Sequence, residues 1–451
     1  MLADLSLPIS PLHPVAETFD AVVLGAGISG LVAASVLLGQ GARRVLVIDE
    51  YDHAGGNHID WSKDGYTFDV GSLIFQDDSP LLRHFPELTS LYVEIDPSWG
   101  RLNPQGMVTA YPISVRDDIL RAGPLEIARM LMSLARARLF GRRLRNARDF
   151  ARFWIGQHLL QRSGLESYMR RFYGVAPEEI DVELAHKRMG WISEHARLAV
   201  FARRLLLARK PAPRSNRQMA RPRAGFAPLY AVAVERLQAG GAHFRLSTQV
   251  RSIVRRDGVF TLDLGGESVS CNRLVSTIPI HRAQQMCGLG DGRQLESVTL
   301  ISLYFSFAGQ RGFAQPIIYN FSHEGAWKRL TVYSDFYGRA NGREYFGVEV
   351  VGHYADNSID KAEADFRRHM RQTGLFDGDL VLEGAQLLDN AYPIYRGNAA
   401  QCAAEAVAAL AAFGVESIGR QGAFNYQPTA RVTTLDAETA LRRDEPAGDS
   451  R

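Results

Sequence analysis

The sequence predicts an α/β protein, and two neighbouring patterns near its start support this prediction. Between residues 21 and 50 an apolar run, a glycine-rich turn, a helix-like stretch and a second apolar run follow one another as AVVLGAGISGLVAASVLLGQGARRVLVIDE. A second pair of glycines comes soon afterwards in DEYDHAGGNHID, residues 49–60. The 451-residue chain is 46% hydrophobic and 22% charged, which provides enough apolar material for a large core.

The first glycine turn, GAGISG, spans residues 25–30 between the strand-like run and the helix-like stretch. In such a turn the first glycine permits the bend, the second lets the backbone approach a diphosphate, and the third lets helix and strand pack closely. Free N–H groups at the start of the helix would then bind the phosphates. We therefore predict a cofactor site at Gly25, Gly27, Ser29 and Gly30. The alternative is a glycine turn in an α/β domain that binds no nucleotide.

An acidic pair follows at the end of the second apolar run. Asp49 lies 19 residues after Gly30, a spacing typical of a carboxylate that accepts hydrogen bonds from ribose hydroxyls. We predict that Asp49 and the adjacent Glu50 belong to the same cofactor site.

The second glycine turn indicates which dinucleotide is bound. A nicotinamide-binding unit needs no further glycine turn at this point, whereas FAD extends across the sheet and is often approached by another backbone loop. Glycines allow that close approach because they carry no side chain. We therefore predict FAD as the cofactor, with Gly55, Gly56 and Asn57 beside it.

With these residues the chain resembles the flavoprotein superfamily that includes UDP-galactopyranose mutase, protoporphyrinogen oxidase and the amine oxidases. DHAGGN is most similar to the mutase, in which a His precedes and an Asn follows the glycine pair, as His53 and Asn57 do here. The resemblance implies that the backbone of Val250 contacts adenine and that Gly419 and Arg420 lie beside the flavin. It also implies an α/β fold with a discontinuous Rossmann-like FAD-binding domain of the GR2 type, a helical insert and an antiparallel-sheet substrate domain.

Six segments are expected along the chain. They are an FAD-binding domain in three parts at 18–114, 216–290 and 391–440, an arginine-rich helical insert at 115–215, a substrate-side sheet domain at 291–390 and a flexible tail at 441–451.

Two classes of chemistry are compatible with such a flavoprotein. In an oxidoreductase of the amine oxidase or protoporphyrinogen oxidase type, the substrate gives a hydride to flavin N5. In the mutase, reduced FAD interconverts the pyranose and furanose forms of a nucleotide-sugar without net redox change. The resemblance places Arg188, Arg329, Tyr392, Arg420 and Tyr426 near sugar, diphosphate or flavin. For Arg329, Tyr392 and Tyr426 a purely structural role is the alternative.

Two departures weigh against the mutase. Its Gly-Pro-His-Ile-Phe-His loop reads GSLIFQ at residues 71–76, so Leu73 stands where the first histidine would be. Its C-terminal Tyr-x-Tyr pattern begins here with Phe424, which has no phenolic hydroxyl. The sequence therefore favours an FAD-dependent oxidoreductase acting on an anionic or sugar-derived small molecule. A mutase-like isomerase is the alternative, and a flavin-containing protein that has lost catalysis is a third.

Arginines crowd the expected helical insert, as in RMLMSLARARLFGRRLRNARDFARFW, residues 129–154. They indicate a solvated helix face, contacts to phosphate or contact with an anionic membrane surface.

A net charge of +3 and the lack of a recognisable nucleic-acid-binding module argue against a nucleic-acid partner. Three cysteines show no metal-site spacing, and no apolar run is long enough to span a bilayer. We expect a cytoplasmic protein, at most peripheral to the inner face of the membrane.

Overall fold

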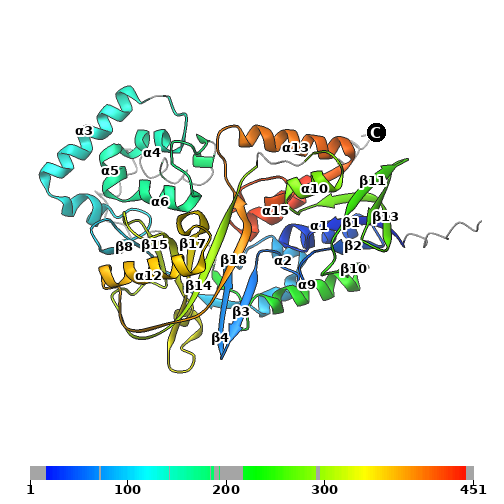
Figure 1. The fold of residues 1–451 in the computed structure, drawn as a ribbon, viewed down its shortest axis with the longest axis horizontal. Coiled ribbons are helices and arrows are strands. Elements are labelled where there is room, and N and C mark those ends of the chain that lie inside the picture. Colours follow the sequence, from blue (N-terminus) through cyan, green and yellow to red (C-terminus); the bar gives the residue numbers. More distant parts are fainter. Residues whose placement is uncertain are drawn as a thin grey trace, which may run out of the picture.

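The computed structural model describes residues 17–70, 73–141, 143–182, 184–186, 192, 217–290 and 295–442. Two seven-stranded sheets organise them, one largely parallel and one largely antiparallel (Figure 1). A group of helices extends from the second sheet at the end of the molecule opposite the first sheet. The arrangement confirms the predicted fold class.

The first sheet is assembled from three parts of the chain that are far apart in sequence. Its order is β10-β2-β1-β13-β12-β11, with β19 beside β13. Strands β10, β2, β1, β13 and β19 run parallel, whereas β12 and β11 are antiparallel. The strands are β1 (Glu17–Leu24), β2 (Val45–Ile48), β10 (Ala242–Arg245), β11 (Ser252–Arg256), β12 (Val259–Asp263), β13 (Ser268–Ser276) and β19 (Val415–Ser417).

Helices cover both faces of this sheet, which explains why β2 reads as an unbroken apolar run. One apolar cluster joins the sheet to α1, α9 and α15, and another joins it to α10 and α13. The helices of this part are α1 (Ile28–Gly39), α2 (Leu81–His84), η1 (Pro86–Ser90), α9 (Ala227–Ala239), α10 (Ile280–Met286), α13 (Ala399–Phe413), α14 (Gly419–Gly422) and α15 (Ala430–Ala440).

The second sheet has the order β18-β14-β17-β16-β15-β7-β8 and is antiparallel except between β15 and β7. Ile301 and Leu303 of β14 pack toward α12, whereas Leu300 and Tyr304 face the opposite side, as strand alternation requires. Its strands are β7 (Trp99–Leu102), β8 (Val108–Ala110), β14 (Ser297–Arg311), β15 (Ile317–Asn320), β16 (Trp327–Val332), β17 (Glu344–Val351) and β18 (Phe376–Pro393). Strands β7 and β8 belong to this second sheet although they lie within residues 18–114, the predicted first part of the FAD-binding domain. The domain bounds given above stay a prediction.

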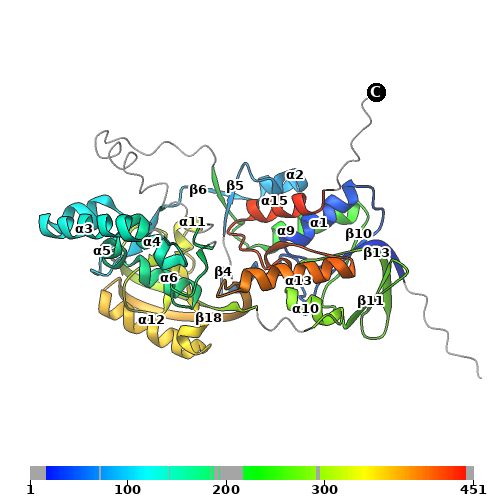
Figure 2. The same cartoon turned by 90° about the horizontal axis from the view of Figure 1, so that it is seen from above.

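Smaller elements complete the fold, and the helices α3, α4, α5 and α6 lie at the end of the molecule opposite the first sheet (Figure 2). They are the hairpin β3 (Ile59–Lys63) and β4 (Tyr66–Val70), the sheet of β5 (Ile74–Gln76), β9 (Gln218–Ala220) and β6 (Val93–Ile95), the helices η2 (Val115–Ile119), η3 (Leu120–Ala122), α3 (Pro124–Phe140), α4 (Ala147–Ile155), α5 (Gln157–Arg162) and α6 (Leu165–Tyr173), and α11 (Ser334–Tyr337), η4 (Gly352–Ala355) and α12 (Ile359–Thr373). None of the described helices has the length and apolar character needed to cross a membrane.

A buried ion pair fastens the β3–β4 hairpin to the rest of the molecule. Arg221, which follows β9, donates from Nε to Asp69 Oδ2 of β4 at 2.6 Å, and both side chains are at most 1% exposed. The hydroxyl of Tyr333 donates to Asp69 Oδ1 at 3.1 Å, and that of Tyr337 donates to the Arg221 carbonyl at 2.9 Å. Removing one partner would therefore leave a buried charge without its counter-ion.

We predict that Arg221→Leu lowers the free energy of unfolding by about 3–5 kcal/mol, the usual cost of breaking a buried ion pair from one side. Arg217→Leu is the matched control, because Arg217 pairs with Asp77 while its side chain is 62% exposed, and exposed pairs contribute about 0–1 kcal/mol. Urea unfolding measures both. Equal effects of the two substitutions would contradict the assigned role of Arg221.

Candidate cofactor and substrate site

The two glycine turns predicted from the sequence lie directly against each other. The Gly55 N–H donates to the Ala26 carbonyl at 2.9 Å. A Cβ added to Gly56 would lie 3.1 Å from the Cα of Gly27, so neither turn tolerates a bulky side chain at this contact. Gly55 has a φ of +119°, which favours glycine. The backbones of both turns therefore form one surface.

The C-terminal segment reaches the same surface. Gly419, at the start of α14, has a φ of +84°, and a Cβ there would lie 2.5 Å from Ser29 Oγ in the first turn of α1. Gly30 is equally constrained, because its Cβ would lie 1.8 Å from the Gly25 carbonyl oxygen. No described side chain caps the N-terminus of α1. Its first-turn N–H groups are thus available to an anion such as a diphosphate.

Asp49 has a second role that the sequence did not predict. Its Oδ2 accepts from the Ala26 N–H at 2.6 Å and its Oδ1 from the Tyr51 N–H at 2.9 Å, so the carboxylate holds the first turn in place. Burial raises the pKa of Asp49 despite these bonds. Each oxygen retains a lone pair for a ribose hydroxyl. The adjacent Glu50 side chain is exposed.

Val250 lies in the segment between β10 and β11 and is 8% exposed. Within the described residues its N–H and C=O make no hydrogen bond, so both are available to a purine edge.

Arg420 supplies the clearest test of whether these residues fit a flavin dinucleotide. Its guanidinium donates to the Gln427 carbonyl at 2.5 Å, and no carboxylate among the described residues pairs with it. Burial lowers the pKa of Arg420, with no anionic side chain to offset that cost. A diphosphate or an electron-rich flavin ring beside Arg420 would provide the missing negative charge. The donor set therefore fits FAD.

A cavity of about 240 Å³ opens beside Arg420 and reaches the second sheet. Its charged lining consists of Lys328, Arg329, Glu349 and Arg420, which gives an excess of two positive charges among the described residues. Apolar residues from both parts of the fold complete the wall; they include Val70, Ile74, Phe75, Phe172, Leu300 and Leu388. The cavity thus suits a ligand that is partly apolar and carries negative charge.

Two of those cations share one carboxylate. Glu349 of β17 lies opposite Arg329 of β16, and its Oε1 accepts from the Arg329 guanidinium while its Oε2 lies 3.0 Å from Lys328 Nζ. Burial alone would raise the pKa of Glu349, but Arg329 and Lys328 outweigh it and hold that pKa below its usual range. Glu349 therefore binds both cations at once.

A β-bulge explains how both cations reach the same side of the sheet. Neighbouring strand residues normally point to opposite faces, and Trp327 indeed faces α12, donating from Nε1 to His369 Nδ1 at 2.8 Å. The pairing of β16 with β17 shifts register between Trp327 and Arg329, so Lys328 is the additional residue. Lys328 and Arg329 consequently both line the cavity. Sequence reasoning identified Arg329 and missed Lys328 and Glu349, because only the three-dimensional pairing reveals the bulge.

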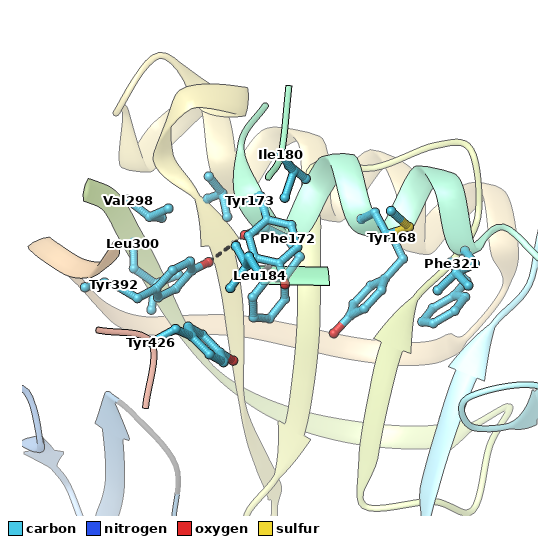
Figure 3. Close-up of a cluster of buried hydrophobic side chains, with 14 of the residues drawn as sticks. Tyr168, Phe172, Tyr173, Ile180, Leu184, Val298, Leu300, Phe321, Tyr392 and Tyr426 are labelled. Carbon is cyan, nitrogen blue, oxygen red and sulfur yellow. Dashed lines mark hydrogen bonds between the residues drawn. The ribbon is translucent and has the colours of Figure 1, made fainter. Parts of the chain in front are cut away.

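The predicted tyrosines, Tyr392 and Tyr426, both line the cavity and lie near each other in Figure 3. The Tyr392 hydroxyl donates to the Phe172 carbonyl at 2.7 Å and accepts from Lys328 Nζ at 3.2 Å. Tyr426 lies beside it and is 9% exposed. The structure thus brings Arg329, Tyr392 and Tyr426 together with Arg420. The fourth predicted catalytic residue, Arg188, lies outside the described residues.

His58 is another cavity residue that the sequence analysis did not select. Its ring stacks on Phe226 with centroids 4.4 Å apart, and its Nδ1 pairs with the Tyr230 hydroxyl. Burial and the nearby Arg420 lower the pKa of His58 to about 3. Neutral His58 therefore accepts the Tyr230 hydrogen at Nδ1 and carries its own proton on Nε2. The preceding DHAGGN motif was the only sequence signal pointing toward it.

Residues 28–309 match the family described as flavin containing amine oxidoreductase. The chain belongs to this family. FAD is the cofactor that this flavin-containing family implies for the chain. The superfamily inferred from the sequence is thereby confirmed.

Solved structures and curated proteins that are similar to this chain cover different shares of it. Reduced UDP-galactopyranose mutase superposes with a TM-score of 0.76 at 18% identity over 94% of each chain. A putative protoporphyrinogen oxidase from Exiguobacterium gives 0.68 at 15% identity over 94% of this chain and 97% of that one. Prolycopene isomerase 2 of an Oncidium hybrid is 52% identical over only 59 residues, 13% of this chain and 10% of that protein. Zebrafish (Danio rerio) all-trans-retinol 13,14-reductase is 47% identical over 57 residues, which are 13% of this chain and 9% of that protein. The chain spans about a tenth of the length of these curated relatives.

We predict that Gly27→Val abolishes FAD retention, because a branched side chain would separate the two glycine turns and obstruct the diphosphate. Gly39→Ala is the matched control at the other end of α1, where an added Cβ meets nothing within 4 Å. The measurement is the ratio of visible flavin absorbance to protein absorbance after purification. A yellow Gly27→Val protein would contradict the proposed diphosphate contact.

His58 gives a pH prediction whose sign follows from its lowered pKa. Because the folded protein holds His58 neutral, its stability contribution is complete above pH 6.5 and is lost as the pH falls toward about 3. Wild-type protein should lose up to about 1.4 kcal/mol of unfolding free energy per pH unit from this group. Denaturant unfolding at pH 6.5 and about pH 5 should show a smaller loss for His58→Gln. Identical pH slopes for the two proteins would exclude His58 as the titrating group.

Proposed function

We propose that this enzyme is an FAD-dependent oxidoreductase in which an anionic small-molecule substrate gives a hydride to flavin N5. The observation that carries the proposal is the cavity cluster in which Lys328 and Arg329 share the single carboxylate of Glu349. Together with Arg420, these residues give the described lining of the cavity more positive than negative charge. Cations in a partly apolar cavity attract anions more strongly than they would in water.

Each part of the cavity has a role in this proposal. Bound FAD supplies the hydride acceptor at N5. The glycine turns and Arg420 hold and orient the dinucleotide, while Lys328 and Arg329 bind the substrate anion. The apolar wall excludes water around the reacting carbon. Tyr392, fixed by Phe172 and Lys328, positions the Lys328 ammonium.

A mutase-like isomerase acting on a nucleotide-sugar is the second candidate. In its favour, Arg329, Tyr392, Arg420 and Tyr426 line one cavity, as the resemblance to the mutase implies. Against it, Leu73, at the place of the mutase histidine, is only 4% exposed and packs in the apolar core. Phe424, at the place of the first mutase tyrosine, is only 3% exposed and is not among the residues that line the cavity.

Anaerobic spectroscopy distinguishes the two functions. The oxidised holoenzyme is mixed with a panel of anionic amines, alcohols and sugar derivatives. Retinol and protoporphyrinogen are included because two of the similar proteins are named after these compounds. Bleaching of the flavin by a panel member, without added reductant, supports the oxidoreductase. Dithionite-reduced holoenzyme is then offered UDP- and dTDP-sugars. Formation of a furanose product without net oxidation overturns the proposal in favour of the isomerase.

The charge cluster gives a quantitative prediction for any substrate found in this way. Arg329→Gln or Lys328→Gln should raise KM about tenfold or more, the effect of losing a charge-assisted hydrogen bond, and should leave FAD bound. Glu349→Gln should lower KM, because it removes the competing anion. Arg343→Gln, on the same sheet but paired with exposed Asp379, is the matched control. Unchanged KM in the Arg329 and Lys328 variants would remove both residues from the substrate site.

A further inference from the structure

One outer surface of the helical region combines exposed apolar side chains with arginines. The six most exposed large apolar side chains of the described residues all lie between residues 120 and 140, with exposed fractions of 54% to 82%; the next, Val254, reaches 46%. The six are Leu120, Leu125, Leu131, Met132, Leu139 and Phe140. Such clustering differs from the scattered exposure of single apolar residues that is normal for a protein surface.

The inner side of α3 already has its packing partners. Met130 and Ala137 are buried there, and the backbone of α3 comes so close to Gly156 that a Cβ on Gly156 would lie 2.9 Å from the Leu134 nitrogen. Arg138 lies over the rings of Phe153 and Trp154 at 4.6 and 4.4 Å. The exposed apolar side chains therefore lie on the outer side of a helix whose inner side is packed against the protein.

Arginines alternate with the apolar residues on this outer face. Leu125, Arg129, Met132, Arg136 and Leu139 follow one another at steps of four, three, four and three, which places them along one side of the helix. All five side chains are exposed. We call this surface, together with Leu120, Leu131, Phe140 and Arg143, the α3 face.

Nearby acids neutralise only part of the charge on the α3 face. Arg129 pairs with Glu126, whereas Arg136 and Arg143 have no carboxylate partner among the described residues. Glu126 also binds His158, and Asp149 pairs with Arg145. A ligand for this face must therefore accept apolar side chains and supply negative charge at the same time.

We propose that the α3 face docks on a bilayer containing anionic phospholipids. Leucine, methionine and phenylalanine side chains would enter the boundary between headgroups and acyl chains, while the arginines would extend their charged ends to the phosphates. A second copy of the chain fits less well, because pairing α3 with itself would bring unneutralised arginines together. The helix also projects at the end of the molecule farthest from the FAD-binding sheet (Figures 1 and 2), which leaves it free to meet a flat surface.

This position links the membrane to the cavity without depending on the proposed reaction. Helix α3 packs on α5, α5 contacts α6, and Phe172 near the end of α6 lines the cavity. The docked enzyme would therefore hold its cavity close to the lipid surface while the FAD-binding sheet remains in water.

Vesicle flotation with the FAD-loaded full chain tests the proposal. The probes are vesicles of phosphatidylcholine alone and of phosphatidylcholine with phosphatidylglycerol. Wild type should float with the anionic vesicles, poorly with the neutral ones, and less as salt concentration rises. Each arginine near an anionic surface strengthens binding about fivefold, so R136Q/R143Q should bind about 25-fold more weakly. The variant M132Q/L139Q/F140Q should bind the anionic vesicles about tenfold more weakly, or weaker still, because it removes apolar side chains from the α3 face.

Matched controls use exposed residues at the other end of the molecule. Arg256→Gln on β11, and Val254→Gln with Val259→Gln, should leave vesicle binding unchanged. Flavin absorbance and melting temperature verify that every variant is folded. Failure of wild type to bind anionic vesicles would overturn the proposal, as would α3-face variants that bind like wild type. Lipid-independent dimers that disappear in the α3-face variants would also overturn it, in favour of an interface between copies.

Discussion

The close backbone contact between the two glycine turns is the constraint on which the rest of the structure depends. The Gly55 N–H binds the Ala26 carbonyl, and Gly56 approaches Gly27 so closely that side chains are excluded from the contact. Asp49 holds the first turn by accepting a hydrogen bond from the Ala26 N–H, and Gly419 allows the C-terminal segment to approach Ser29 closely. Segments separated by hundreds of residues therefore converge at the N-terminus of α1, and they position Arg420 as a partly buried cation for which the described residues supply no acidic partner.

The second sheet complements this arrangement with charge. The bulge at Lys328 turns two consecutive strand residues toward the cavity, and Glu349 binds both. A regular strand would have presented one cation and one carboxylate, which neutralise each other. The bulge thus adds a second cationic side chain to this wall of the cavity and interrupts the regular β-ladder at one position. The cavity consequently joins the surface that we propose binds the dinucleotide to a surface suited to an anionic ligand.

Local patterns in the sequence predicted the first of these surfaces well. Glycines at 25, 27 and 30, Gly55 and Gly56 are informative because missing side chains have a direct geometric purpose, and the discontinuous parallel sheet followed from the resemblance. The second surface was predicted only in part. Arg329 was identified, but Lys328 and Glu349 depend on a register shift and His58 on its stacking with Phe226, and neither leaves a local signal. The arginine-rich helix was recognised as basic, whereas its exposed leucines resemble core residues until packing shows otherwise.

The central claim is that the converging backbone segments bind a diphosphate bridge, and competition for the apoprotein tests it most directly. Apoprotein is titrated with FAD in the presence of ADP, which retains the diphosphate but lacks the flavin, or of FMN, which retains the flavin and a single phosphate. The account predicts that ADP competes with FAD and that FMN binds far more weakly than FAD. FMN binding as tight as that of FAD, with no competition from ADP, would contradict it.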